Sequence, residues 1–345
     1  MGVLEAKQDR VTPVPNANGD LLVVRDLSVN FCLDHEREAR VLKQVSFTIV
    51  PGEIVGLLGE SGSGKTTTAL SLICLLPECA RIVAGSVRFC GQELLELERR
   101  RIRAIRGAEI SIIHQDAHVL NPVMGVGTQV MEVLRSHKSG KATDMRDEIH
   151  SLFEALGLKD SDRIYRAFPH QLSGGERRRV AIAQALICKP RLVIADEPTA
   201  WLDSDTMFEI LSVFRKLQKA YNTAFLLISH DPEALMMADR VLVMYAGEIV
   251  EDASRIEIFE RPMHPYTSAL FQCGGYGSAS RCADSRPRSF PHIPGHAPDP
   301  SETQVGCSFS SRCFERSDEC DLRRPELHRI SSSRSVRCVQ YEARS

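Results

Sequence analysis

The sequence predicts an α/β fold, in which a mainly parallel sheet is covered by helices on both faces. Three observations support this prediction. Short apolar segments alternate with helix-length segments along most of the chain, a glycine-rich loop joins one such segment to a helix, and another apolar segment ends in two carboxylates. Ligands bind at the carboxyl edge of such sheets, so we expect the glycine loop and the carboxylates to meet there.

The composition is typical of a globular protein. The 345 residues suggest about two domains, or one large domain with an appendage. Hydrophobic residues make up 43% and charged residues 26%, which allows a sizeable core. No segment reads as a membrane span, a signal peptide or a lipid-anchor motif. A formal net charge of -2 argues against general recruitment by nucleic acid or anionic lipid, so we expect any membrane attachment to come through a partner.

The elements are predicted from apolar spacing and from the positions of glycine and proline. In the first part of the chain, the expected strands lie at 23–31, 45–50, 53–58, 87–90 and 109–114, and the expected helices at 66–76 and 94–105. Residues 121–171 are polar with helical spacing, clearest at 144–156, and predict an inserted helical subdomain that extends to about residue 178. Beyond it, we expect strands at 191–195, 224–229 and 241–245, and helical segments at 204–220, 232–238 and 256–260.

The composition changes near the end of the chain. Residues 274–296 are rich in glycine, serine, arginine and proline, which is typical of a linker or loop. We therefore expect an N-terminal tail at 1–20, a main domain at 21–260 and a small C-terminal extension at 261–345.

The glycine-rich loop reads GESGSGKT and matches the pattern GxxxxGK[ST] between a predicted strand and a predicted helix. Its glycines allow backbone N–H groups to cradle phosphate, and the helix N-terminus adds positive charge. We expect Lys65 to reach the β- and γ-phosphates and the Thr66 hydroxyl to ligate Mg²⁺. The predicted nucleotide-binding residues are Gly59, Glu60, Ser61, Gly62, Ser63, Gly64, Lys65, Thr66 and Thr67. The alternative is a glycine-rich turn that binds no ligand.

Two further segments suggest phosphate chemistry. Asp196 and Glu197 follow an apolar strand, where one carboxylate can hold Mg²⁺ and the next can orient or deprotonate the attacking water; otherwise they are simply solvated acids. Ser173, Gly174 and Gly175 precede an arginine-rich helix that we expect to begin near Arg177. Donors at a helix start suit phosphate, although this segment alone is weak evidence.

In this order, the motifs resemble those of the nucleotide-binding subunits of ATP-binding-cassette (ABC) transporters, over about residues 21–260. Gln115 and His230 stand where that family has its Q-loop glutamine and switch histidine. The resemblance implies a P-loop NTPase fold and a dimer, in which the signature segment of one subunit, here residues 172–176, caps ATP held by the P-loop of the other. Catalytic roles fall to Glu197, His230 and Gln115, and Mg²⁺ contacts to Thr66, Asp196 and Gln115.

The resemblance also assigns Phe31 and Asp203. Phe31 matches the aromatic residue that stacks on adenine, although it also reads as an ordinary core phenylalanine. Asp203 is retained in the loop after the two carboxylates, where Ala200 and Trp201 depart from the usual serine and small residue. The catalytic residues are all present, so we expect activity to be kept.

The C-terminal part resembles the oligopeptide, dipeptide and nickel import family. The segment RPMHPYT at 261–267, the IPG at 293–295 and the GCSFSSRC at 306–313 carry this resemblance, as does the region 115–122, where Ala117 replaces a common proline. It implies an ATPase that powers peptide import at the cytoplasmic face of the inner membrane. Its implied partners are two transmembrane permease subunits, a second ATPase in a heterodimer and an extracytoplasmic solute-binding protein.

Two alternatives stay open. Nickel or another small solute can replace peptides, because substrate contacts lie on other proteins. A soluble ABC ATPase that acts on DNA or ribosomes is a distant alternative, since the chain has neither long coiled coils nor a second cassette.

Four cysteines, Cys307, Cys313, Cys320 and Cys338, follow the spacing C-x5-C-x6-C-x17-C. Four soft ligands suit zinc or an iron–sulfur cluster, and either would stabilise a small loop-rich extension. Members of the resembled family carry a [4Fe–4S] cluster on cysteines so placed, which implies one here. Zinc, disulfides and free thiols are the alternatives.

Overall fold

The computed structural model describes residues 19–34, 37–114, 120–200, 204–273 and 292–342. The strands are β1 (Leu22–Cys32), β2 (Glu38–Ile49), β3 (Ile54–Leu58), β4 (Ala80–Phe89), β5 (Gln92–Glu93), β6 (Ile110–Ile113), β7 (Leu192–Asp196), β8 (Ala224–Ser229), β9 (Arg240–Tyr245), β10 (Glu248–Ser254), β11 (His328–Arg329) and β12 (Arg334–Val336). The helices are α1 (Lys65–Leu72), α2 (Arg99–Ile105), α3 (Val126–His137), α4 (Ala142–Ala155), α5 (Ser161–Arg166), α6 (Gly174–Leu186), α7 (Ser204–Tyr221), α8 (Arg255–Glu260), α9 (Pro265–Cys273), α10 (Glu319–Leu322) and α11 (Val339–Glu342).

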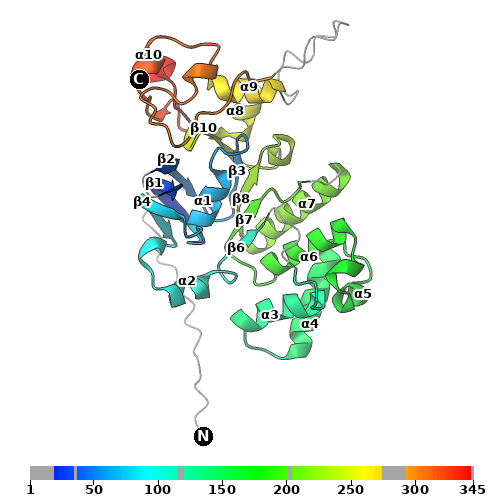
Figure 1. The fold of residues 1–345 in the computed structure, drawn as a ribbon. Coiled ribbons are helices and arrows are strands. Elements are labelled where there is room, and N and C mark those ends of the chain that lie inside the picture. The colour runs from blue at the N-terminus through cyan, green and yellow to red at the C-terminus, as the bar shows by residue number, and fades with distance from the viewer. Residues whose placement is uncertain (1–18, 35–36, 115–119, 201–203, 274–291, 343–345) are drawn as a thin grey trace, which may run out of the picture.

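The strands form two sheets. The smaller sheet has the order β2-β1-β4-β5 and is antiparallel. The larger sheet has the order β11-β12-β10-β9-β3-β8-β7-β6, in which β9, β3, β8, β7 and β6 are parallel. This parallel centre, with helices around it, confirms the predicted α/β class (Figure 1).

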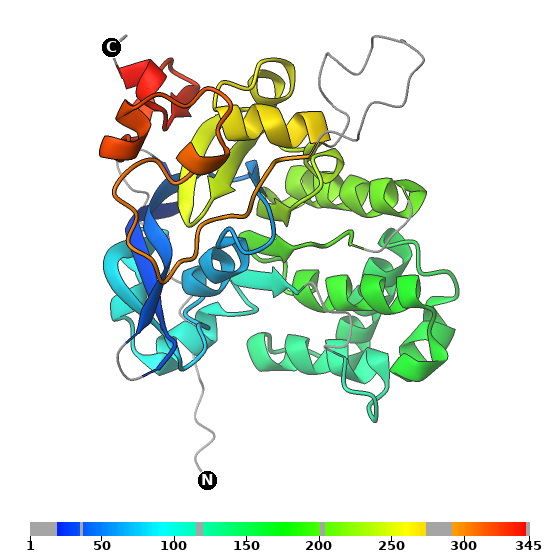
Figure 2. The same ribbon diagram turned by 45° about the horizontal axis from the view of Figure 1, so that its top comes forward.

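The helical subdomain and the C-terminal extension lie at opposite ends of the molecule (Figures 1 and 2). Helices α3, α4 and α5 form the predicted helical insertion, and the apolar spacing at 144–156 corresponds to α4. Among the described residues, no helix is long and apolar enough to cross a membrane.

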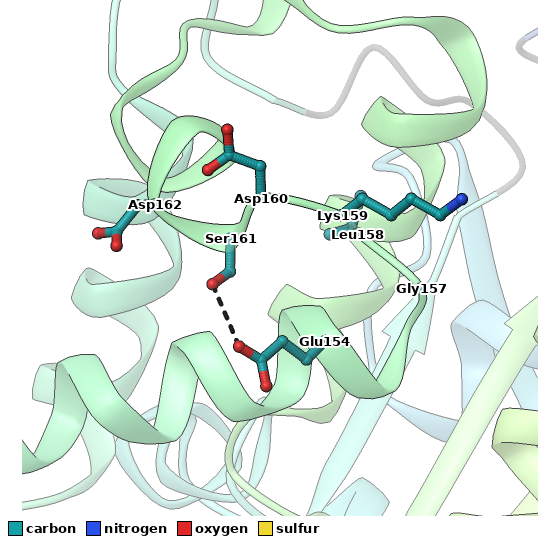
Figure 3. A pocket seen from close by; sticks show the side chains of 7 residues that line it. All are labelled: Glu154, Gly157, Leu158, Lys159, Asp160, Ser161 and Asp162. Atoms are coloured by element: carbon teal, nitrogen blue, oxygen red, sulfur yellow. Dashed lines mark hydrogen bonds between the residues drawn. The ribbon is translucent and has the colours of Figure 1, made fainter.

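A shallow hollow of about 440 Å³ lies between α4 and α5 (Figure 3). Its charged lining consists of the carboxylates of Glu154, Asp160 and Asp162 and one cation, Lys159. The Ser161 hydroxyl lies 3.5 Å from the Glu154 carboxylate. The net charge of this lining is negative and repels an anionic nucleotide, so this hollow does not compete with the glycine loop as a phosphate site.

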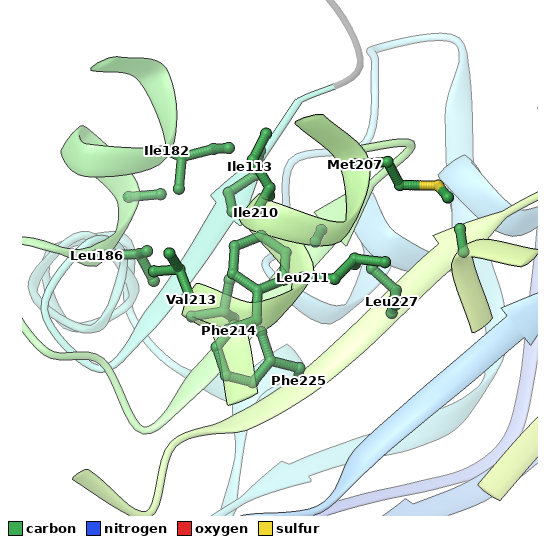
Figure 4. Packing of buried hydrophobic residues seen from close by; sticks show 14 of the residues in the cluster. Ile113, Ile182, Leu186, Met207, Ile210, Leu211, Val213, Phe214, Phe225 and Leu227 are labelled. Carbon is green, nitrogen blue, oxygen red and sulfur yellow. The ribbon is translucent and has the colours of Figure 1, made fainter. Parts of the chain in front are cut away.

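Alternate residues of the parallel strands enter two separate cores. Val55, Leu57 and Leu226 face a core shared with α1, α2 and the smaller sheet. Phe225 and Leu227, on either side of Leu226 in β8, face the other core, which they form together with α3 to α7. Figure 4 shows part of this second core, where Ile182 and Leu186 of α6 and Met207, Ile210, Leu211, Val213 and Phe214 of α7 pack against the sheet. The sheet is therefore buried on both faces.

Three helices differ in their bounds from the prediction. The helix predicted at 66–76 ends at Leu72. Cys74 takes a left-handed φ of 53°, and the Leu75 N–H donates to the Leu70 carbonyl, which closes the helix before Pro77. The predicted helix at 94–105 is a 3₁₀ turn followed by α2, because an extended Leu97 lets the chain bury Leu94. At 232–238 only a 3₁₀ turn forms, since Asp239 already pairs with Ile54 of the sheet.

The C-terminal extension joins the main sheet and does not stand apart from it. Strand β12 pairs with β10, and the Arg40 N–H of β2 donates to the Pro300 carbonyl at 2.7 Å. The fully buried Glu251 carboxylate accepts from the N–H groups of Met263 and His264, at 2.9 and 3.0 Å. The extension therefore shares a sheet and a core with the main domain, which explains how so short a segment is held in place.

Candidate functional site

The glycine loop joins β3 to α1, as the sequence predicts. Gly64 caps α1 with a φ of 107°, which residues with a Cβ rarely adopt. A Cβ at Gly64 would lie 2.7 Å from Leu42 Cδ2, and one at Gly59 would lie 2.3 Å from the Met244 carbonyl oxygen. Close packing therefore requires glycine at both positions, whereas Ser61, Gly62 and Thr66 remain exposed at the mouth of the loop.

Lys65 is folded back over its own loop. Its Nζ donates to the carbonyl oxygens of Gly59 and Glu60, at 2.8 and 2.9 Å. Burial lowers the pKa of Lys65, while the carboxylates of Glu197, Asp196 and Glu60 raise it. A phosphate oxygen can replace these two carbonyls as the acceptor, so the lysine is positioned for the predicted role.

Two buried oxygen atoms at this site, Ser63 Oγ and Asp196 Oδ1, have no hydrogen-bond partner within the described chain. Such atoms are rare in proteins and indicate a missing ligand or water. Burial raises the pKa of Asp196, which the Thr66 hydroxyl and Lys65 partly offset. A divalent cation prefers carboxylate and hydroxyl oxygens, so Asp196 and Thr66 fit the predicted Mg²⁺.

Glu197 is the most closely held carboxylate of the site. Its φ of 48° turns the chain sharply at the end of β7, and its N–H still donates to the Ile228 carbonyl at 3.0 Å. The Ser229 hydroxyl donates to Oε2 at 3.2 Å, and the His230 N–H donates to Oε1 at 2.9 Å. His230 Nδ1 also lies 2.7 Å from Oε1. The His230 side chain is 64% exposed against 9% for Glu197, so the histidine faces the open side of a buried carboxylate.

The signature segment begins a helix, although earlier than predicted: α6 starts at Gly174 and not near Arg177. Ser173 is its N-cap, with Oγ accepting from the Glu176 N–H and the Glu176 carboxylate accepting from the Ser173 N–H. A Cβ at Gly174 or Gly175 would meet no atom within 4 Å. These two glycines therefore face open space at the helix N-terminus, where another molecule can approach.

Arg178 lies beside the candidate site, although motif analysis did not single it out. The guanidinium is buried and donates to the carbonyl oxygens of Glu197 and His114 at 2.6 Å each, and to that of Pro198 at 2.8 Å. It thus joins the signature helix to the loop of the catalytic carboxylate and to the residue before Gln115. In the sequence it is one of three consecutive arginines, with no signal to distinguish it.

We expect Arg178→Ala to lower the ATPase rate by about 10-fold, because carbonyls left without a donor cost about 1–3 kcal/mol and free the loop that holds Glu197. Phosphate release at saturating ATP measures this effect. Arg177→Ala, one residue earlier and half-exposed, is the matched control and should keep the wild-type rate. Equal rates for the two variants would contradict this role of Arg178.

The remaining predicted site residues have mixed outcomes. Phe31 lies near the end of β1, opposite Ala39 and Ala80, and packs partly buried against the smaller sheet's core. Part of the Phe31 side chain therefore packs in the core, and the rest is exposed. Gln115, Trp201 and Asp203 lie outside the described residues.

The four C-terminal cysteines lie near enough to influence one another. Burial, together with the nearby Cys320 and Cys338, raises the pKa of Cys307 to about 12. The pKa of Cys313 is raised to about 11 in the same way. All four are free thiols, and nowhere in the described residues are three or more His, Cys, Asp or Glu side chains arranged to hold a metal ion. The predicted cluster finds no support in this arrangement.

Two protein-family models match the chain. One, described as ABC transporter, covers residues 42–200, and the other, described as oligopeptide/dipeptide transporter, C-terminal region, covers residues 250–320. A dipeptide transport ATP-binding protein of Haemophilus influenzae is 37% identical, over 92% of this chain and 94% of its own. An oligopeptide transport ATP-binding protein of Salmonella typhimurium is 36% identical, over 96% of this chain and 97% of its own.

Solved structures show the same similarity for the main domain. An ATP-binding cassette solved as a dimer with ADP and phosphate is 26% identical, with a TM-score of 0.62, over 68% of this chain and 98% of its own. CbiO1 of Clostridium perfringens, part of the ABC transporter complex CbiONQ, shares the fold with a TM-score of 0.60 at 24% identity, over 70% of this chain and 91% of its own.

Proposed function

Because the chain belongs to the ATP-hydrolysing subunits of ABC transporters and carries the oligopeptide/dipeptide C-terminal region, we propose that it powers the import of di- or oligopeptides through a membrane transporter. The observation that carries this proposal is a hydrolytic site joined to that C-terminal region in one chain. Relatives that align over nearly their whole length are named for dipeptide and oligopeptide transport.

The hydrolytic step follows from the contacts of Glu197. The carboxylate is held by Ser229 and His230, so one oxygen is oriented to accept a proton from the attacking water. With nucleotide bound, Lys65 would donate to the β- and γ-phosphates in place of the loop carbonyls. Asp196 and Thr66 would hold Mg²⁺, which would neutralise phosphate charge. His230, at the open side of Glu197, contacts the γ-phosphate.

The signature segment suggests that ATP is bound between two subunits. Gly174 and Gly175 face open space at the start of α6, where a phosphate held by a second chain can be capped. Phe31 would stack on adenine through its exposed part, and the family resemblance assigns Gln115 and Asp203 to the same site. The second chain is a related ATPase in a heterodimer.

The other partners follow from the role of an import ATPase. Two permease subunits form the channel, and an extracytoplasmic solute-binding protein delivers the peptide. The chain then sits at the cytoplasmic face of the inner membrane and binds no nucleic acid, in keeping with its net charge of -2.

Peptide uptake by cells tests the function. Cells that lack this chain should fail to accumulate labelled di- or oligopeptides, and the wild-type gene should restore uptake while Glu197→Gln should not. If the deletion leaves peptide uptake unchanged and abolishes uptake of nickel or another solute, the peptide assignment is refuted. The assignment as a transport ATPase then stands.

A [4Fe–4S] cluster on Cys307, Cys313, Cys320 and Cys338 is a separate proposal. Its support is the resemblance of the C-terminal part. Burial raises the pKa of Cys307, Cys313 and Cys338, so these three thiols would require a cation to favour thiolates. Chain purified without oxygen should contain about four irons and four sulfides, lost in Cys307→Ser. An active chain purified without metal would refute the cluster and mean that the four cysteines are free thiols.

A further inference from the structure

Glu60, the second residue of the P-loop, is held by residues from the far end of the chain. Its N–H donates to the Tyr266 hydroxyl of α9 at 2.8 Å. Its two carboxylate oxygens accept from Arg312 of the extension, at 2.9 and 3.1 Å. One two-point ion pair and one backbone contact therefore join the C-terminal part directly to the phosphate loop.

Arg312 is built into its position. Its side chain is only 6% exposed, against 28% for Glu60. It also donates to the Pro294 carbonyl at 2.9 Å and lies over the ring of Tyr245, 5.7 Å from the ring centre. Phe309 packs edge-on against Tyr245 and Tyr266, with ring centres 5.1 and 5.4 Å apart. A buried bidentate contact in rigid surroundings is stronger than an ordinary surface ion pair.

The contact bears on phosphate binding in two ways. The Glu60 carbonyl is one of the two acceptors of Lys65, so the position of Glu60 affects the lysine. The Glu60 carboxylate is also within electrostatic range of Lys65, whose pKa it raises. Without a counterion, that negative charge would oppose a polyanionic nucleotide at the same loop.

We propose that Arg312 is a positioning residue of the ATP site, which neutralises Glu60 and fixes the entrance of the P-loop, so that nucleotide affinity depends on the docked C-terminal extension. This inference rests on the ATP binding of the proposed function and adds a role for the extension that no motif indicates. Tyr266 also holds Glu60, because its hydroxyl accepts from the Glu60 N–H.

Equilibrium binding of a fluorescent ATP analogue with Mg²⁺ to the full chain tests the proposal. Arg312→Gln should raise Kd by about 10-fold, within the range for loss of a charged hydrogen bond. Glu60→Gln in the same chain should recover most of that loss, because it removes the uncompensated charge. Simple destabilisation would give no such recovery.

Arg324→Gln is the matched control. Arg324 also ties the extension to the main domain, through Glu248 and the Lys43 carbonyl, without contact with the P-loop. It should keep the wild-type Kd, with thermal unfolding recorded for every variant. If Arg312→Gln does not fold, Arg312→Lys keeps the charge without the two-point contact and should show a Kd between wild type and a 10-fold rise.

Three outcomes would overturn the proposal. The first is a wild-type Kd in folded Arg312→Gln or, where that variant does not fold, in Arg312→Lys. The second is a double variant that binds no more tightly than Arg312→Gln. The third is an equal loss of affinity in Arg324→Gln. In each case wild-type chain still binds the analogue, and the ATPase function stands. A wild-type chain that does not bind it would refute both.

Discussion

Glu197→Gln is expected to bind ATP normally and to hydrolyse it about 10²–10⁴-fold more slowly, the range for loss of a positioned general base. Glutamine has the same shape and can keep the contacts with Ser229 and the His230 N–H, so the fold and the nucleotide contacts should survive. It cannot accept the proton of the attacking water. The change therefore separates binding from chemistry.

Single-turnover hydrolysis and equilibrium ATP binding, both on the purified transporter complex, measure the two effects. Glu209→Gln is a matched control, since Glu209 is an exposed acid on α7 that pairs with Arg179. It should hydrolyse ATP at the wild-type rate. Residual hydrolysis in Glu197→Gln above about a tenth of wild type would show that another group accepts the proton.

Lys65→Ala is expected to weaken ATP binding by at least about 30-fold, since removal of a buried charged partner costs about 2–5 kcal/mol. Lys65 Nζ donates directly to the loop backbone, and alanine leaves the Gly59 and Glu60 carbonyls without this donor. The fold should persist, because alanine is a good helix former at the first position of α1.

Titration of the full chain with a fluorescent ATP analogue measures the loss. Lys138→Ala in α3's C-terminal cap, which removes a lysine paired with Glu148, should bind as wild type does. A Kd for Lys65→Ala within threefold of wild type would mean that backbone N–H groups alone carry the phosphate contact.

Local motifs indicated where to look for the candidate nucleotide site, because phosphate chemistry imposes residue types at fixed spacing. Gly59 and Gly64 are required by packing distances, and Asp196 lies with an unpaired oxygen beside Thr66. The order of the motifs carried the family, which the comparisons confirm.

Element ends were less predictable. The helix after the P-loop ends at Leu72, before the left-handed Cys74, and does not extend to Pro77. Its end is set by backbone hydrogen bonds that any residue can make. The segment at 232–238 is only a turn because Asp239 must pair with Ile54 in the sheet. Local spacing contains no information on such distant partners.

The sequence by itself determined the α/β class, the phosphate loop, the two carboxylates and the family. These depend on residue type and spacing, and both are visible along the chain. Only the tertiary structure decided the partners of Arg178 and Arg312, because the closest partner of Arg178 lies 19 positions away and Glu60 lies 252 positions from Arg312. Folding distinguishes these two from the many other arginines by burying them against carbonyls or a carboxylate, since a buried guanidinium must be paired.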